Sequence, residues 1–101
     1  MCIRDSNAIK ETFGEDIPKI SSTKSLSGHP LGAASVHEAI YCLIMMKNNF
    51  ITGSANITDM DDVAKKFPII AKTETGSTLN TVMSNSFGCG GTNAALIFEK
   101  V

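Results

Sequence analysis

The sequence contains no tryptophan, a single tyrosine and no long block of like charges. Its 9 basic and 10 acidic residues leave a net charge of −1, so it lacks the basic surface typical of nucleic-acid-binding domains and the acidic tail of disordered activators. The longest apolar run, residues 39–46, is too short to cross a membrane. With 101 residues, 43% of them hydrophobic, the remaining class is one small globular domain.

Cysteine is scarce, and its count of 3 is odd. Cys2, Cys42 and Cys89 match no metal-ligand spacing, and residues 1–6 have neither the apolar centre of a signal peptide nor the arginine content of a transit peptide. We therefore expect reduced thiols and a cytoplasmic location. We interpret residues 1–6 as a spurious junction and expect the natural protein to continue upstream of them.

Helix signals occur at two places in the chain. Apolar spacing over residues 6–14 predicts a short helix, capped by Ser6 and ended by Gly14 in the left-handed conformation. Residues 31–48 predict a longer helix that stops at the Asn-Asn pair that begins with residue 48. That helix is apolar on nearly all sides, which is typical of a buried helix.

The other segments predict extended or irregular structure. Residues 17–23, "IPKISST", predict a short strand, and residues 25–31 predict a loop. Residues 61–67 fit a single helical turn. Residues 79–87 and 93–100 predict a terminal β-hairpin, whose connection "GCGG" requires a tight bend led by the glycine backbone.

Glu38 lies on the predicted long helix beside Ala34, Cys42 and Met45, which are apolar or nearly so. A carboxylate is costly to bury there unless a cation pairs with it. Lys24, at the exit of the predicted strand, is the best-placed cation. The alternative is that Glu38 lies at the edge of the helix in solvent. A buried Lys–Glu pair is weak evidence for stability, but it fixes geometry as active sites require.

His29 stands in a Gly- and Pro-containing loop just ahead of the predicted long helix. A histidine in such a loop is usually a surface or packing residue. The N-terminus of a helix, however, favours a neutral imidazole, which can donate a hydrogen bond to an oxyanion. His37 shares a helix face with apolar residues, and we assign it to packing or to an interface.

The glycine-rich bend is a weak candidate for a phosphate site, because it joins two strands and opens no helix. Phe87 comes directly before this bend. Its ring belongs either to the core or to the mouth of a cavity on a mobile loop.

Two separated motifs, "TKSLSGHPLGAAS" followed by "VHEAIYCLIM", and "MSNSFGCGGTNAALIFEK" at the end, closely resemble the C-terminal portion of β-ketoacyl-acyl-carrier-protein synthases. The segments "EAIYCLIMM" and "TVMSNSFG" are most similar to type I members of the family. The resemblance implies a thiolase-like layered α/β fold in a homodimer. Residues 7–101 would be a partial C-terminal β-ketoacyl synthase domain, with a strand, a buried helix and a terminal β-hairpin.

The resemblance implies a decarboxylating Claisen condensation in fatty acid elongation. Malonyl-acyl-carrier-protein loses CO₂, and the resulting carbanion attacks an acyl thioester held on a cysteine. His29 matches the second catalytic histidine, which stabilises the enolate oxygen, and Lys24 matches the active-site lysine. Glu38 matches the glutamate that pairs with this lysine, and Phe87 matches the gatekeeper beside the nucleophile. No cofactor or metal is implied, since the substrates are phosphopantetheine thioesters of acyl carrier protein.

The chain departs from the family pattern at Ser35, where the family has glycine, and at Cys89, where it has phenylalanine. The family's nucleophilic cysteine and first histidine lie in its N-terminal half. We therefore expect the parent protein to be an enzyme and this chain alone to be inactive, since such groups act as a unit. The alternatives are a ketosynthase domain of a polyketide synthase and a non-catalytic dimerisation or binding module.

Overall fold

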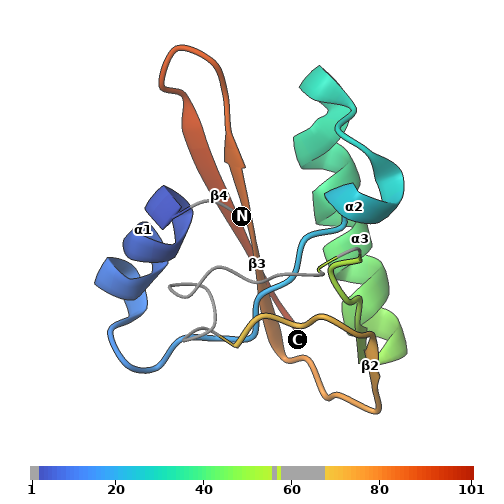
Figure 1. Cartoon of the computed structure of the whole chain (residues 1–101). Coiled ribbons are helices and arrows are strands. Elements are labelled where there is room, and N and C mark those ends of the chain that lie inside the picture. The colour runs from blue at the N-terminus through green and yellow to red at the C-terminus, as the bar shows by residue number, and fades with distance from the viewer. Residues whose placement is uncertain (1–2, 56, 58–67) are drawn as a thin grey trace.

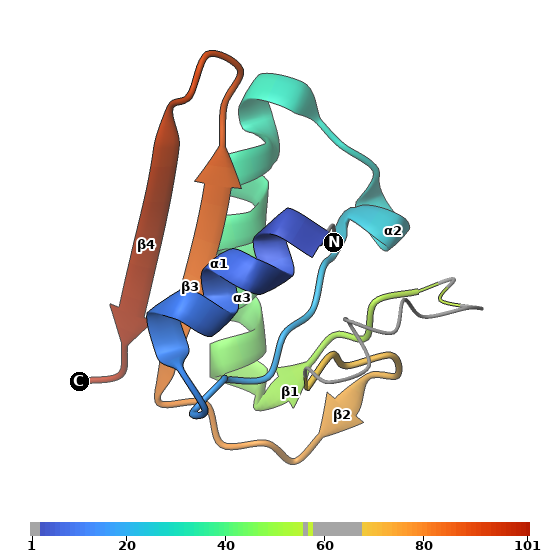
Figure 2. The ribbon, with the colours of Figure 1, turned by 60° about the vertical axis from the view of Figure 1, so that its left-hand side comes forward.

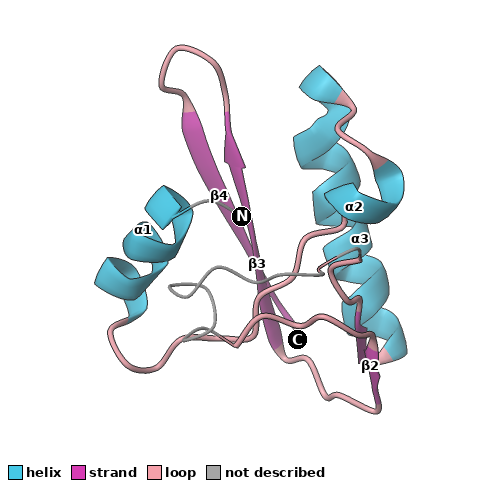
Figure 3. Cartoon of the chain, viewed as in Figure 1, coloured by secondary structure: helices cyan, strands magenta, loops and turns pink. Residues whose placement is uncertain are grey.

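The computed structural model describes residues 3–55, 57 and 68–101 (Figure 1). All helices come before all strands in the described part of the chain, and Figure 3 colours the two kinds of element separately. The elements, in chain order, are α1 (Ile3–Phe13), α2 (Lys24–Ser27), a 3₁₀ turn (Leu31–Ala33), α3 (Ala34–Asn48), β1 (Phe50–Ile51), β2 (Glu74–Thr75), β3 (Thr81–Phe87) and β4 (Asn93–Glu99). The helical turn expected over residues 61–67 lies outside the described residues.

The C-terminal hairpin forms the centre of the arrangement. Strands β3 and β4 pair antiparallel from Thr81 opposite Glu99 to Phe87 opposite Asn93, so the predicted hairpin is confirmed. Helix α3 packs along β3, and α1 lies on the other side of the hairpin (Figures 1 and 2). Figure 2 also shows that β3 and α3 run in opposite directions, which brings the end of β3 beside the start of α3.

The bend between the two strands depends on glycine. Gly90 and Gly91 have φ angles of 92° and 89°, in the left-handed region that side chains disfavour. The bend closes where the amide of Gly88 donates to the carbonyl of Thr92 at 2.6 Å. The predicted backbone-led turn is therefore confirmed.

Helix α1 ends as its sequence predicts but does not begin there. Gly14 has φ 63° and donates its amide to the carbonyl of Lys10 at 2.8 Å, which closes the last turn. Ser6 lies inside the helix, because α1 starts at Ile3. The prediction that Ser6 caps this helix is therefore wrong.

The segment expected to be a strand over residues 17–23 pairs at one residue only. Ile20 forms an isolated parallel bridge with Ile69. A longer ladder does not form, because Pro18 has no amide hydrogen and the amide of Ser22 donates instead to the hydroxyl of Ser54. The prediction of a loop over residues 25–31 is also partly wrong, because the helical turn of α2 occupies the start of this segment.

Helix α3 ends at Asn48, as expected, and Asn49 follows in the left-handed conformation with φ 53°. One face of α3 is covered, and on it lie the buried side chains of Ala34 and Met46. The opposite face is exposed in this chain, so burial of the helix on all sides stays a prediction for the whole protein. The exposed apolar residues of that face are Val36, Ile40, Leu43 and Ile44.

The core of the described chain is correspondingly small. Its buried hydrophobic residues are Ala34, Met46, Ile51 and Ile70, and Ser84 of β3 is the buried polar residue beside them. Among the described residues, no helix is both long and apolar enough to span a membrane.

Candidate functional site

Lys24 and Glu38 form an ion pair between the start of α2 and the covered face of α3. Lys24 Nζ donates to Glu38 Oε1. The side chain of Glu38 is 17% exposed, whereas that of Lys24 is 40% exposed. The predicted pairing is therefore confirmed, and the alternative of a solvated Glu38 is wrong. The lysine is therefore the more exposed partner of the pair and the glutamate the more buried one.

His29 is held by a neighbouring backbone group. The amide of Leu31 donates to Nδ1 of His29 at 3.1 Å. Leu31 itself has φ 50°, an uncommon conformation for a residue with a side chain. A neutral imidazole that accepts at Nδ1 carries its proton at Nε2. The exposed ring can therefore donate a hydrogen bond from Nε2, as an oxyanion would require.

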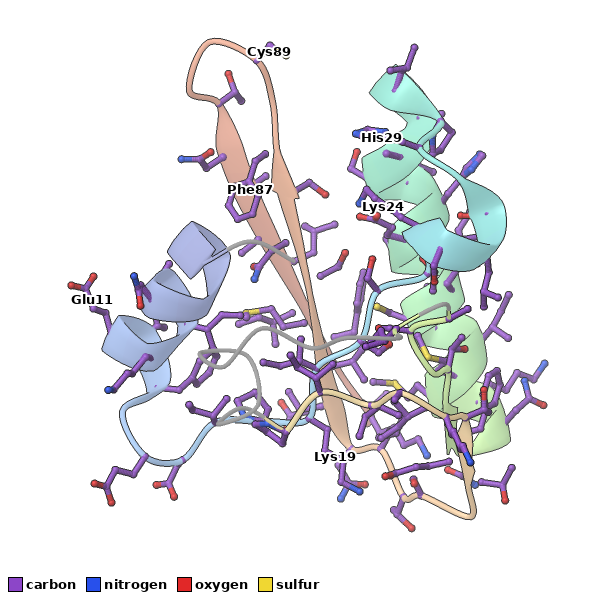
Figure 4. All side chains as sticks on the ribbon, viewed as in Figure 1. Glu11, Lys19, Lys24, His29, Phe87 and Cys89 are labelled. Carbon is purple, nitrogen blue, oxygen red and sulfur yellow. The ribbon has the colours of Figure 1, made fainter. Side chains whose placement is uncertain are left out.

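Phe87 ends β3 at the same end of the molecule as His29. Figure 4 labels both residues, one on the hairpin and one on the loop before α3. Phe87 is 66% exposed, so it is not a core residue in this chain. Side chains alternate along a strand, so Phe87 and the buried Ser84 lie on opposite faces of β3. Phe87 and His29 share an end of the fold, and a shared site between them stays a prediction.

The other histidine lies in the second turn of α3. His37 is exposed on α3, with its ring centroid 6.3 Å from that of Tyr41. In this chain it does not belong to the core, so the packing half of its assignment is wrong and the interface half stays a prediction. Ser35, one of the two departures from the family pattern, is half-buried in the first turn of α3.

The two described cysteines have different surroundings. Burial raises the pKa of the Cys42 thiol above its ordinary value, and the charge of Glu38 raises it further. Cys89 lies exposed in the glycine-rich bend. Since a thiolate is the reactive form, Cys42 is a poor nucleophile, in agreement with its predicted position among apolar residues. Within the described ranges, no three His, Cys, Asp or Glu side chains gather as metal ligands do.

This contrast predicts unequal alkylation of the two thiols. At pH 7.5, iodoacetamide is expected to modify Cys89 well before Cys42, because Cys42 is partly buried and has the raised pKa. Peptide mass spectrometry over a time course measures both rates in one sample. The same chain in urea is the control, where the two rates should converge. Equal rates without urea would contradict the surroundings described for Cys42.

Two features of the site were not predicted from the sequence. One is the positive φ of Leu31, for which the sequence carries no signal because leucine rarely adopts it. The other is a pair of serine hydroxyls, on Ser25 and Ser54, that bind backbone amides distant in the sequence. Serine at a loop predicts local hydrogen bonds, and nothing in its immediate sequence identifies a remote partner.

Comparison with known proteins finds relatives over nearly the whole chain. Residues 4–58 match the family model described as "Beta-ketoacyl synthase, C-terminal domain". The chain is 54% identical over 98 residues to 3-oxoacyl-acyl-carrier-protein synthase 1 of Haemophilus influenzae, which covers 97% of this chain and 24% of the relative. It is 50% identical over 99 residues to the synthase 1 of Escherichia coli K12, covering 98% of this chain and 24% of the relative.

A solved structure agrees in fold as well as in sequence. The crystal structure of a β-ketoacyl synthase from Burkholderia phymatum STM815 superposes with a TM-score of 0.86 at 38% identity, over 98% of this chain and 24% of that one. The helix and hairpin arrangement is thus part of a thiolase-like α/β fold, as the two sequence motifs predicted. The chain spans about a quarter of the length of these relatives. It belongs to the β-ketoacyl synthase family, and the match lies in the C-terminal domain of that family.

Proposed function

We propose that this chain contributes the second catalytic histidine, the active-site lysine and the gatekeeper region of a 3-oxoacyl-acyl-carrier-protein synthase. The observation that carries the proposal is the fixed imidazole of His29, whose Nδ1 accepts from the Leu31 amide so that Nε2 is the donor. The names of the relatives support this chemistry, since both are 3-oxoacyl-acyl-carrier-protein synthases. The substrates of the whole protein would be malonyl and acyl thioesters of acyl carrier protein.

The proposed reaction uses the Nε2 hydrogen of His29 at the carbonyl oxygen of the malonyl thioester. When the bond between the α-carbon and the carboxylate breaks, its electron pair moves into the enolate and CO₂ leaves. The α-carbon then bonds to the carbonyl of the acyl thioester, and the cysteine thiolate departs. A hydrogen-bond donor at the enolate oxygen stabilises the charge that develops there.

Lys24 and Glu38 would set the charge around this histidine. The ion pair fixes the ammonium group near the loop that leads to His29, and Glu38 holds it from the covered face of α3. Phe87 would stand at the entrance for the acyl chain, at the end where β3 meets the start of α3. Cys89 in the adjoining bend leaves less side chain there than the phenylalanine of the family pattern.

We further propose that the whole protein works as a cytoplasmic homodimer in fatty acid biosynthesis and needs no bound cofactor or metal. The nucleophile would be a cysteine of the whole protein that lies outside this 101-residue chain. Cys42 is unsuited because its thiol has a raised pKa. The chain alone is therefore expected to release CO₂ from malonyl-acyl-carrier-protein at the background rate.

A chimera tests the proposal. The 98 matched residues of the Haemophilus influenzae synthase 1 are replaced by those of this chain, and the product is assayed for CO₂ release and 3-oxoacyl-acyl-carrier-protein formation. We expect activity within about tenfold of the unmodified enzyme. A tenfold loss corresponds to roughly 1.4 kcal/mol of transition-state stabilisation. A folded chimera without condensation would contradict the proposal and favour a non-catalytic binding module.

A further inference from the structure

Helix α2 carries Lys24 and leads directly to His29, yet very little apolar burial holds it. It has four residues, none of them buried, and its leucine, Leu26, is 62% exposed. A single helical turn is not stable in water without outside contacts. Thr23 precedes α2 and makes no side-chain capping bond to it. Other interactions must therefore fix the turn.

Two hydrogen bonds link this region to the segment after β1. The amide of Ser22 donates to the hydroxyl oxygen of Ser54 at 2.9 Å. The amide of Ala55 donates to the hydroxyl oxygen of Ser25 at 2.8 Å. Each segment thus gives one backbone donor and one hydroxyl acceptor to the other. We call this reciprocal pair of bonds the serine clasp.

The clasp brackets Lys24 on both sides. Ser22 and Ser25 flank it in the chain, and Glu38 binds its ammonium group. The carbonyl of Lys24 in turn accepts from the amide of Gly28 at 2.8 Å, one residue before His29. Displacement of α2 would therefore move the ammonium group of Lys24. It would also move the loop that carries His29.

We propose that the serine clasp of Ser22, Ser25, Ser54 and the Ala55 amide positions α2, and through it Lys24 and His29, for the condensation reaction. The role in catalysis rests on the proposed function above, whereas the hold on α2 does not. Ser25 and Ser54 are positioning residues, because they act through the backbone of the loop and need not touch substrate.

The test uses the chimera defined above with Ser25→Ala, Ser25→Thr and, as the matched control, Ser27→Ala. Ser27 lies on the same turn, but among the described residues its hydroxyl bonds to the neighbouring carbonyls of Thr23 and Gly28. Ser25→Ala is expected to lower kcat about tenfold with KM for malonyl-acyl-carrier-protein unchanged, since small misplacement of catalytic groups is costly. Ser25→Thr, which keeps a hydroxyl, should restore most of kcat, and Ser27→Ala should leave it near the parent value.

Hydrogen–deuterium exchange of the same proteins gives a readout that needs no activity. Ser25→Ala should speed exchange at the amide of Ala55 and at the α2 amides about fivefold, as loss of one ordinary hydrogen bond would, and Ser27→Ala should not affect Ala55. Unchanged exchange in Ser25→Ala would overturn the clasp, whether or not the chimera turns over. Faster exchange with kcat intact would overturn its positioning role. An inactive parent chimera that keeps this exchange pattern would reject the proposed function and leave the hold on α2 supported.

Discussion

Replacing His29 with alanine in the chimera is expected to lower the rate of CO₂ release and of condensation about 10²- to 10³-fold, the usual effect of removing one oxyanion donor. The reason is the geometry at the imidazole, where the Leu31 amide occupies Nδ1 and leaves the proton on Nε2. The side chain is exposed, so its removal should cost little stability. Release of ¹⁴CO₂ from labelled malonyl-acyl-carrier-protein measures the effect.

His37→Ala is the matched control for this experiment. His37 is the other histidine of the chain and is also exposed, but it lies on the outer face of α3 beside Tyr41. Its removal should leave both rates within about twofold, because nothing assigns it a role in the reaction and its predicted place is at an interface. If His29→Ala kept the parental rate, or if both variants lost activity equally, the role assigned to His29 would be wrong.

The second large effect is expected in the 101-residue chain by itself. Residues 36, 40, 43 and 44 of α3 form one apolar stripe, and their exposure in this chain lies between 44% and 59%. Ile97 of β4 adds further apolar surface at 67% exposure. Monomeric soluble proteins rarely expose large contiguous apolar patches, and patches of this kind lead to association. We expect the isolated chain to associate at micromolar concentrations, measured by analytical ultracentrifugation.

A pair of charge variants distinguishes association through the stripe from association through any exposed apolar residue. Ile40→Lys places a charge in the centre of the stripe and should shift the chain strongly toward monomer. Leu26→Lys adds the same charge at an exposed leucine of α2 and should change the distribution little. A monomeric parent chain, or equal effects from the two variants, would contradict the role given to the stripe.

The elements that could be predicted from the sequence are those fixed by local patterns. Glycines at the left-handed positions specified the end of α1 and the hairpin bend, and the Asn-Asn pair specified the end of α3. The Lys24–Glu38 pair was predictable because a carboxylate beside apolar helix neighbours requires a cation. The glycines and the Asn-Asn pair lie within a few positions of the turns and helix ends that they determine. For Glu38, the cost of burying an unpaired carboxylate leaves few possible arrangements.

What could not be predicted depends on remote partners. The turn of α2 and the residues before it bond to Ser54 and Ala55, and Ile20 bridges to Ile69. The exposure of one face of α3 depends on what packs against it, which periodicity alone does not report. The conformation of Leu31 runs against the usual preference of its residue type, as is common at functional sites.

The pairing of Ile20 with Ile69 bears on the order in which the chain acquires its structure. The β3–β4 hairpin joins neighbours in sequence and can form within about 1–10 μs, as short hairpins do. The Ile20 bridge must close a long stretch of intervening chain, and the entropy of that closure is lost before any contact compensates for it. The segment that carries Lys24 follows this late contact directly. The placement of Lys24 would then be acquired late during folding and would be lost early when the molecule opens locally.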